Sequence, residues 1–469
     1  MPINSFLYPA KNVPVVYEVA NSLRFNNDSS DNLSRTPSSA SNRRTFTFST
    51  WFKLSGTDGS FISAGTDISN GPLFIIDILS GGNEGILRIE DTVSGDNVIA
   101  LRTNRKLRDP SAWMHIVVAI DTTQSTASDR VKLYINGTQE TSFLSSYQTY
   151  PTQNLELAIN NTHEHRIGTR AANTSGKFFD GYMCETVLID GSQLDPTSFG
   201  EFDSDSPRIW KPKDVSGLTF GTNGFYLDFE NASSLGADVS GNSNNFTVNN
   251  LTSVDQSSDS CTNNFCTFNS IVNAAGNNLT LSEGNLKVTS GDNNWNSAIG
   301  TIAVNSGKWY WEVKIINATY NYNHGVFSLD TGDINNTDNP MNQTGYSGFY
   351  NFDGGETRID NTVSTSNFGT FAANDILGFY LNADDNQFTI YKNGSSHVSA
   401  TNLGTGRTDL VPIAVHYNGG VSEYNFGSPS FSISSGNSDA NGYGNFEYSP
   451  TIGGVNYYAL NTKNLAEFG

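Results

Sequence analysis

Carboxylates on alternate residues, Glu201, Asp203 and Asp205, are the part of this sequence closest to a hydrolytic site. Glycoside hydrolases place two carboxyl groups across the bond they cleave, and Glu-x-Asp-x-x-Glu on one strand is one way to supply them. The segment here lacks the final Glu, and Pro207 follows it closely. Because proline favours a loop over a strand, we interpret the segment as a solvated turn and predict that the chain is not an enzyme.

Three segments have residue types and spacings that could bind a metal ion. His163 and His165 would lie on one face of a strand, as two zinc ligands could, but no third ligand is evident nearby. The acidic segments 330–338 and 384–385 could hold calcium through carboxylates and backbone carbonyls, although neither has the EF-hand spacing. Runs of Asp, Asn and Gly also form ordinary turns. We predict no metal or other cofactor, with calcium at one of these acidic loops as the alternative.

Tyrosines interleaved with Asn, Ser and Gly give the clearest binding signal, in segments 317–325 and 345–352. A tyrosine ring offers a flat apolar face and a hydroxyl, and Asn offers both a donor and an acceptor. This combination favours recognition of sugars or protein loops, and the alternative is that the rings are core residues, as we expect for Trp309 and Trp311. The predicted ligand-binding residues are Tyr320, Tyr322, His324, Tyr346 and Tyr350.

The composition indicates an all-β protein. Of 469 residues only 15% are charged, and the polar bulk comes from Asn, Ser, Thr and Gly, which suit turns and strands better than helices. A net charge of −20 argues against nucleic acid or an anionic membrane as a partner. No apolar run is long enough for a membrane span, so we predict no membrane insertion. The first residues lack the pattern of a signal peptide, so we expect no export by the common route.

The three cysteines, Cys184, Cys261 and Cys266, do not form the pattern of a disulfide framework. The short step from Cys261 to Cys266 could close a small loop under oxidising conditions. Two unpaired thiols in a polar segment are the alternative.

Strands and hairpins follow from local patterns. Residues 45–54 alternate, which places Phe46, Phe48, Phe52 and Leu54 on one face. Leu-Tyr-Ile-Asn-Gly at 133–137 and Ile-Tyr-Lys-Asn-Gly at 390–394 each run from an apolar strand into Asn-Gly, which fits a tight hairpin turn. We therefore expect two related β-sandwiches in series.

The first two hundred residues resemble the laminin-G-like, concanavalin-type jelly roll. The phrases that carry this resemblance lie at 22–25, 46–51, 113–118, 133–137 and 179–183. A second set of phrases resembles a SPRY domain, which is another two-sheet sandwich and usually a protein-recognition module. Those phrases lie at 307–315, 375–381, 388–394, 411–415 and 424–427.

The predicted fold is therefore all-β: two concanavalin-like jelly-roll β-sandwiches in tandem, with a loop-rich bridge and extended termini. The bridge either begins another laminin-G-like unit that is never completed or adds strands to the first sandwich. The predicted segments are an N-terminal docking arm (1–20), the laminin-G-like sandwich (21–205), the Gly/Asn/Ser-rich bridge (206–269), the SPRY-like sandwich (270–430) and a C-terminal tail (431–469).

This order of segments resembles structural proteins of marine bacteriophages, including tail-fibre and head-appendage proteins. The resemblance implies a virion surface protein, made in the host cytoplasm, that binds a host-surface glycan or protein through its loops. It also implies contacts with other virion proteins through the N-terminal arm and a homo-oligomer, a trimer if the protein is a fibre. The alternatives are a head-decoration or tail-assembly protein and, third, a polysaccharide depolymerase.

Overall fold

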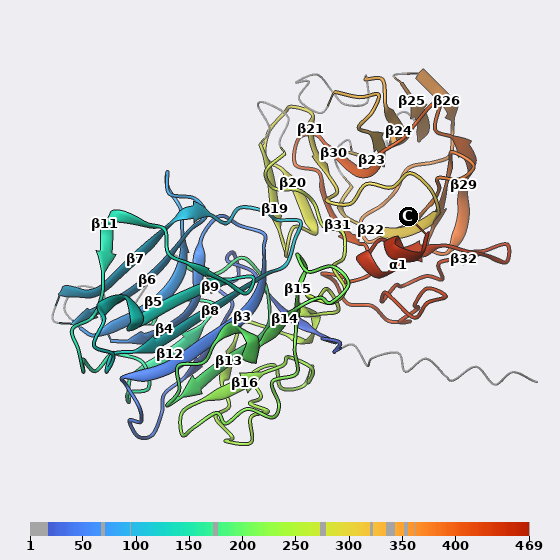
Figure 1. Ribbon diagram of the computed structural model, residues 1–469. Helices are drawn as coiled ribbons and strands as arrows, with labels where there is room; N and C mark the ends of the chain where they lie inside the picture. The colour runs from blue at the N-terminus through green and yellow to red at the C-terminus, as the bar shows by residue number, and fades with distance from the viewer. Residues whose placement is uncertain are drawn as a thin grey trace, which may run out of the picture.

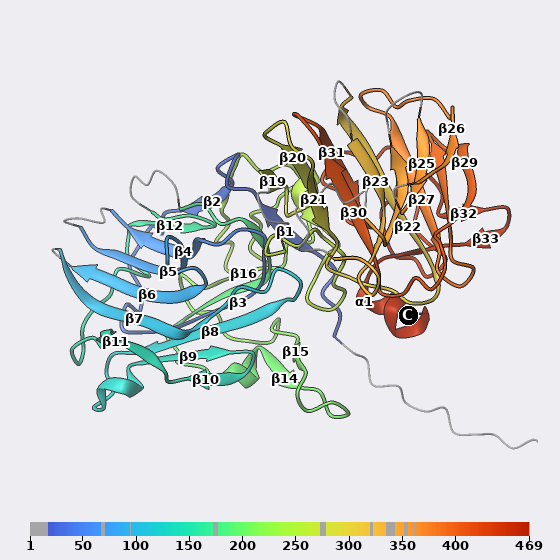
Figure 2. The same cartoon turned by 90° about the horizontal axis from the view of Figure 1, so that it is seen from above.

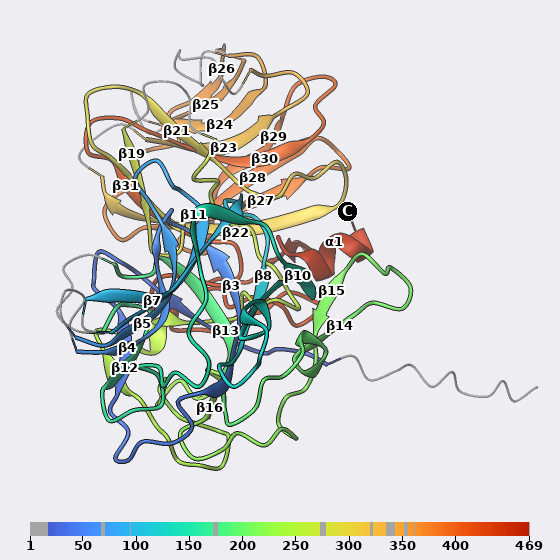
Figure 3. The same cartoon turned by 60° about the vertical axis from the view of Figure 1, so that its left-hand side comes forward.

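The computed structural model describes residues 17–66, 71–93, 95–171, 177–272, 278–318, 322–333, 343–350, 355–360 and 362–468. Two β-sandwiches lie side by side (Figure 1), and Figure 2 shows β1 on the side of the first sandwich that faces the second. Within the described residues the one α-helix is α1 (Thr462–Phe468), at the junction of the sandwiches (Figure 3). No helix among these residues has both the length and the apolar character needed to cross a membrane.

Two sheets build the first sandwich. The first contains, in spatial order, β10 (Thr138–Glu140), β9 (Val131–Ile135), β8 (Met114–Asp121), β3 (Thr45–Leu54), β13 (Gly181–Asp190), β1 (Ser22–Phe25) and β18 (Gln256–Ser257), with β16 (Phe225–Leu227) also paired to β13. The second contains β11 (Phe143–Thr149), β7 (Asp96–Lys106), β6 (Ile86–Val93), β5 (Leu73–Leu79), β4 (Gly59–Gly65), β12 (Glu164–Ile167), β2 (Asn32–Arg35) and β17 (Thr247–Asn249).

Strand β3 shows how the sequence builds this core. Its alternation places Phe46, Phe48, Phe52 and Leu54 in the cluster between the two sheets, as the pattern predicts. The opposite face of the same sheet is also covered. There Val117 and Ile189 pack with a second apolar cluster that includes Phe199, Val215, Phe220 and Tyr226. The centre of the first sheet is therefore buried on both faces, which is why Thr47 and Ser49 of β3 are buried as well.

The bridge completes the first sandwich. Strand β16 pairs with β13, β17 pairs with β2, and β18 pairs with β1, all antiparallel. Phe225, Phe246 and Leu251 from the same segment join the central core. The structure thus shows the second of the two possibilities left open for the bridge, and the sandwich extends beyond the expected boundary at residue 205.

The second sandwich also has two sheets. The larger contains β19 (Leu279–Ser282), β20 (Lys287–Ser290), β31 (Val421–Asn425), β22 (Lys308–Asn317), β27 (Ile376–Asn382), β28 (Gln387–Lys392) and β29 (Ser395–Asn402), with β34 (Tyr458–Ala459) paired to β22. The smaller contains β21 (Asn296–Ile299), β30 (Leu410–His416), β23 (Tyr322–Ser328), β24 (Tyr346–Tyr350), β25 (Glu356–Ile359) and β26 (Thr362–Ser366). Two tryptophans of β22, Trp309 and Trp311, are core residues, as expected.

Both ends of this sandwich differ from the expected boundaries. Cys266 and Phe268, which precede residue 270, are part of its core. The tail supplies β34, which runs parallel to β22, and Phe446 and Tyr457 pack on the outer side of the larger sheet. Short elements complete the chain: the hairpins β14 (Gly200–Phe202) with β15 (Trp210–Pro212) and β32 (Thr451–Ile452) with β33 (Val455–Asn456), and the 3₁₀ turns η1 (Ala127–Asp129), η2 (Pro196–Ser198) and η3 (Ser253–Asp255).

The two Asn-Gly hairpins form as predicted. Asn136 and Gly137 have φ values of 47° and 74°, and Asn393 and Gly394 have 50° and 75°. Positive φ at both central positions is the geometry of the tight turn that Asn-Gly favours. Each glycine also lies against an aromatic ring from later in the chain, Trp210 for Gly137 and Tyr448 for Gly394.

Candidate functional site

A buried arginine joins the two sandwiches. Arg24, on β1, has a side chain that is 1% exposed. Its guanidinium donates to the Asp255 carboxylate at 3.0 Å and to the carbonyl oxygen of Pro429, on the loop after β31, at 3.1 Å. Glu283, between β19 and β20, lies 3.5 Å from the same group. A buried cation needs several acceptors, and here the bridge and the second sandwich supply them to an arginine of the first sandwich.

A buried lysine lies nearby. The Lys53 ammonium, on β3, donates to the Asp259 carboxylate at 2.8 Å, to the Asn264 side-chain oxygen at 2.7 Å and to the Phe265 carbonyl at 2.8 Å. Trp113 donates its indole N–H to the other oxygen of Asp259 at 2.9 Å. The lysine thereby ties the first sandwich to the chain just before the second. Together these contacts hold the two sandwiches in one relative orientation.

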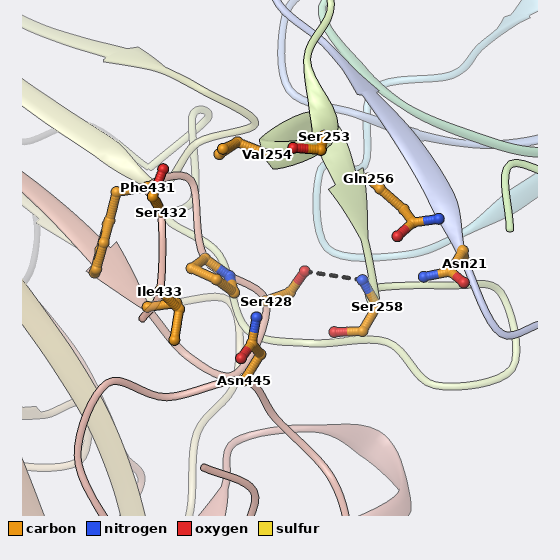
Figure 4. A pocket seen from close by; sticks show the side chains of 11 residues that line it. Asn21, Ser253, Val254, Gln256, Ser258, Ser428, Phe431, Ser432, Ile433 and Asn445 are labelled. Carbon is orange, nitrogen blue, oxygen red and sulfur yellow. Dashed lines mark hydrogen bonds between the residues drawn. The ribbon is translucent and has the colours of Figure 1, made fainter. Parts of the chain in front are cut away.

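The junction pocket is next to Arg24, because two of its lining residues, Val254 and Pro429, accept hydrogen bonds from that guanidinium. Three distant segments of the chain meet at the pocket (Figure 4). It has a volume of about 300 Å³. Its floor forms because β18 pairs with β1, while η3 is fixed by a capping box in which Thr252 and Asp255 bond to each other's backbone N–H groups. The lining residues are Asn21, Ser253, Val254, Gln256, Ser258, Ser428, Pro429, Phe431, Ser432, Ile433 and Asn445.

The junction pocket is lined by neutral polar groups. None of its eleven lining residues carries a charge, and hydroxyls and carboxamides predominate. Ser428 joins the two sides, because its hydroxyl lies 2.6 Å from the Ser257 hydroxyl and accepts from the Ser258 N–H at 3.2 Å. Asn445 and Ser432 are exposed, so their polar groups can reach a ligand. Such a lining suits a neutral, hydroxyl-rich ligand better than an anion or a metal ion.

A second pocket of about 350 Å³ adjoins the first, and Ser258 and Asn445 line both. It lies between residues 18–20, the bridge and the tail. Tyr443 contributes an aromatic ring, with the Lys463 ammonium 5.6 Å from its centre. The two pockets form one depression along the junction, with Asn445 at the boundary between them.

The three predicted ligand-binding residues whose side chains the structure describes do not line this depression. Tyr322 and His324 of β23 point into the core of the second sandwich, and both are at most 1% exposed. Tyr346 of β24 is also fully buried, in an apolar cluster on the other face of the same sheet. Interior side chains cannot form a solvent-facing aromatic surface, so the prediction is wrong for these three. Tyr320 and the side chain of Tyr350 lie outside the described residues.

The environment of His324 agrees with an interior role. Its Nδ1 lies 2.6 Å from the Tyr424 hydroxyl, and its ring contacts those of Tyr322 and His416. Burial lowers the pKa of His324 well below its usual value. The imidazole is therefore neutral and part of a packed aromatic group.

The histidine pair of the first sandwich is not arranged as a zinc site. His165 is 1% exposed, its Nε2 accepts from the Asn160 N–H at 3.0 Å, and its Nδ1 lies 2.8 Å from the His163 carbonyl. Both ring nitrogens are thus already engaged. Within the part of the chain that the structure describes, no three His, Cys, Asp or Glu side chains are grouped so that they could hold a metal ion.

The carboxylates that were considered for catalysis or calcium have partners within the chain. Asp203 accepts from the N–H groups of Ser206 and Asp205, and backbone hydrogen bonding holds its pKa below the usual range. Lys211 lies within 3.4 Å of both Glu201 and Asp203. Asp203 and Asp205 thus lie in a solvated turn, as predicted, whereas Glu201 lies on strand β14. Asp384 is bonded to Lys308 and to the Gly307 N–H, while residues 334–338 lie outside the described residues.

Local sequence patterns do not predict the junction pocket. The segment 428–445 is rich in Ser, Asn and Gly, which reads as a loop. Asn21 and most of residues 253–258 are polar, but nothing in their local spacing indicates that they meet residues 428–445. The pairing of β18 with β1 and the hydrogen bonds of Ser428 to Ser257 and Ser258 bring these segments together.

Comparison with known proteins gives a family for part of the chain. Residues 27–193 match the model of the concanavalin A-like lectin/glucanases superfamily, of the laminin-G type. The first sandwich is similar to this superfamily. That match confirms the laminin-G-like prediction, and the strands described above confirm the all-β prediction. Concanavalin-like folds occur in enzymes and in binding proteins, so the fold does not decide between them.

Several solved structures show weaker likeness. The SPRY domain of human HERC1 and the PSpry domain of TRIM65 are each 16% identical with a TM-score of 0.28, and each covers 34% of this chain. The match includes 96% of the first and 88% of the second. A heptameric SAP-like pentraxin from Limulus polyphemus is 15% identical over 38% of this chain and 80% of its own, again with a TM-score of 0.28. No curated protein matched significantly.

Proposed function

We propose that this chain is a non-enzymatic recognition protein of a phage virion surface, of tail-fibre or appendage type, and that its junction pocket binds a neutral glycan. The neutral polar lining of that pocket carries the proposal. Sugars present many hydroxyls and no charge, and the serine hydroxyls with Asn21, Gln256 and Asn445 supply both donors and acceptors. A protein loop rich in Ser or Asn would use the same groups.

The charge of the chain supports this choice of ligand. A net charge of −20 disfavours acidic polysaccharides through long-range repulsion. A shallow site with few apolar contacts binds weakly, with a Kd of about 1 mM for one copy. A homo-oligomer would raise the effective affinity a hundredfold or so when several copies engage one surface. Weak single sites combined in an oligomer are a reasonable design for attachment to a host cell.

A direct test uses neutral oligosaccharides of hexoses and N-acetylhexosamines, measured by calorimetry or by ligand-observed NMR. Binding should weaken by about tenfold in Asn445→Ala, which removes a polar group common to both pockets. Ser432→Trp should abolish binding by filling the pocket, because Ser432 is exposed and its replacement removes no packing. Thr138→Ala, exposed on β10 of the first sandwich, is the matched control and should bind normally.

Three results would contradict the proposal. If no neutral oligosaccharide or intact host cell bound the protein, a recognition role would be excluded. If ligand bound equally well to Ser432→Trp, the site would lie elsewhere. Release of reducing ends from host polysaccharide would instead establish a depolymerase.

A structural virion protein is the second candidate. Tyr17 and Val19, at the end of the predicted arm, are anchored to the body of the molecule through Glu185 and Thr262. An anchored base would let residues 1–16, which lie outside the described residues, dock on another virion protein. Labelling the chain on intact particles distinguishes the two, since a decoration protein would cover the capsid evenly and a fibre would mark the tail.

A further inference from the structure

Two of the three cysteines lie close together at the base of the N-terminal arm. The Cys184 thiol, on β13, donates to the Cys261 sulfur across an Sγ–Sγ distance of 3.5 Å. Cys184 is fully buried, and Cys261, on the bridge, is half-buried. Cys266, one possible partner of Cys261 from the sequence, is in the core of the second sandwich, where its thiol faces the Thr267 carbonyl and the Thr301 hydroxyl. The pair that the structure brings together is therefore not the one that sequence proximity favours.

Both sides of this thiol pair are held in place. On the bridge, Ser260 donates to the Val19 carbonyl at 2.7 Å, and Thr262 accepts from the Val19 N–H at 3.0 Å. Cys261 is thus fixed between two anchored neighbours. On β13 the register shifts directly after Cys184, and Glu185 has a φ of 50°. Such a bulge redirects side chains locally and is costly unless its surroundings maintain it.

We propose that Cys184 and Cys261 form a reversible disulfide that fastens the bridge to strand β13. The reaction needs an oxidant, for which we take a peroxide. The Cys261 sulfur attacks one peroxide oxygen, the O–O bond breaks, and Cys261 becomes a sulfenic acid as one water leaves. The Cys184 sulfur then attacks the sulfenic sulfur, the S–O bond breaks, and a second water leaves as the S–S bond forms. Two thiols are oxidised, and the peroxide is reduced to two waters.

The surroundings of the two thiols favour oxidation of Cys261 before attack by Cys184, and they make the overall reaction slow. Cys261 is the more exposed residue of the pair, so we take it as the one that the oxidant reaches first. Burial raises the pKa of Cys261 well above its usual value, and little thiolate is present at neutral pH. Oxidation should accelerate as the pH rises towards 9. Trp51 and Trp210 pack around Cys184 and exclude competing solvent from the second step.

The cross-link would close the loop that completes the first sandwich. The two cysteines are 77 residues apart, and the intervening chain contains β14 to β18. Closing so long a loop restricts the unfolded chain, and this stabilises the folded state. The disulfide would therefore hold the late-added strands β16, β17 and β18 on the sandwich.

The test uses the full chain exposed to hydrogen peroxide at pH 9, then denatured, alkylated and digested. Before oxidation three thiols should be alkylated; afterwards only Cys266 should be, with one linked peptide pair that contains Cys184 and Cys261. The Tm should rise by about 5 °C and return on reduction. Three remaining thiols, or a link between Cys261 and Cys266, would overturn the proposal.

Two variants distinguish the effect of the disulfide on Tm from other effects of oxidation. Cys261→Ser should form no intramolecular link and show no rise in Tm with peroxide. Cys266→Ala should still form the link, whatever its own stability. A rise in Tm in Cys261→Ser as large as in the parent chain would show that another reaction, such as methionine oxidation, causes it, and would count against the proposal.

Discussion

Arg24 donates a hydrogen bond across the boundary between the two sandwiches to the carbonyl oxygen of Pro429, at 3.1 Å. This contact belongs to a buried set in which Arg24 also pairs with Asp255. A buried cation shared between domains makes their separation costly, because opening the junction would leave its acceptors without a partner. The junction pocket therefore has a fixed shape.

Removal of this cation should destabilise the whole molecule. Arg24→Ala leaves the buried Asp255 carboxylate without its cation, and we expect a loss of roughly 3–5 kcal/mol in the free energy of unfolding. Denaturant unfolding followed by tryptophan fluorescence measures it. Arg44→Ala is the control, since Arg44 is 45% exposed and pairs only with exposed Glu156; it should cost about 0.5 kcal/mol or less. Equal effects of the two substitutions would contradict a structural role for the junction.

Glu185 should make stability depend on pH. Burial, the largest cause, raises its pKa from 4.5 to about 7, while Tyr17 and Tyr226 donate hydrogen bonds to its oxygens. The folded state then binds more protons than the unfolded state between pH 4.5 and 7, so stability falls as the pH rises through this window. The shift corresponds to at most about 3 kcal/mol.

The variant Glu185→Gln isolates this effect. It keeps an oxygen that accepts from the tyrosines but cannot titrate, so its Tm should change less between pH 5 and pH 8 than that of the parent chain. Glu156→Gln, at an exposed ion pair, is the matched control and should follow the parent. Identical pH profiles for Glu185→Gln and the parent would refute the prediction.

The hairpin glycine of the first sandwich should resist substitution. A Cβ on Gly137 would lie 2.4 Å from the Trp210 ring, and the residue has a φ of 74°. We expect Gly137→Ala to cost roughly 3 kcal/mol, from overpacking and from left-handed strain together. Gly82→Ala is a close control: Gly82 has a φ of 85° but no neighbour within 4 Å, so only the strain of about 1 kcal/mol remains. Thermal unfolding of both variants gives the comparison.

The extent of the first sandwich can be tested with two fragments. Residues 17–205 lack β16, β17 and β18 and the core side chains Phe225, Phe246 and Leu251, each worth about 2 kcal/mol of burial. We expect this fragment to unfold without cooperativity or to aggregate, and residues 17–269 to unfold in a single transition. A cooperative transition in the shorter fragment would show that the bridge is dispensable.

Local features of this fold were predictable from the sequence. The alternation of β3 and the Asn-Gly hairpins depend on neighbouring residues only, so their patterns are readable. The completion of the first sandwich by β16 to β18 was left open, because pairings such as Ser22 with Ser257 join residues far apart in the chain. The junction pocket was not predicted for the same reason, since its lining residues are also far apart in the chain.

The aromatic site was misjudged for a different reason. The sequence around Tyr322 and His324 mixes polar and aromatic residues, as an exposed binding strand would. Strand β23, however, lies between β30 and β24, and apolar clusters cover both of its faces. Polar groups such as the His324 imidazole are accommodated inside through a partner, Tyr424, which the sequence does not reveal. In a central strand with two buried faces, the local sequence pattern does not indicate which residues surround each side chain.

The late pairing of β18 with β1 has a consequence for synthesis of the chain. The strand made first, β1, receives one of its neighbours only after about 230 further residues have left the ribosome. Until then one edge of β1 stays open, next to an already collapsed sheet, and could pair with the same edge of a neighbouring nascent chain. Slow translation through the bridge, or crowding of chains on one messenger, should therefore determine how much of this protein reaches its native form.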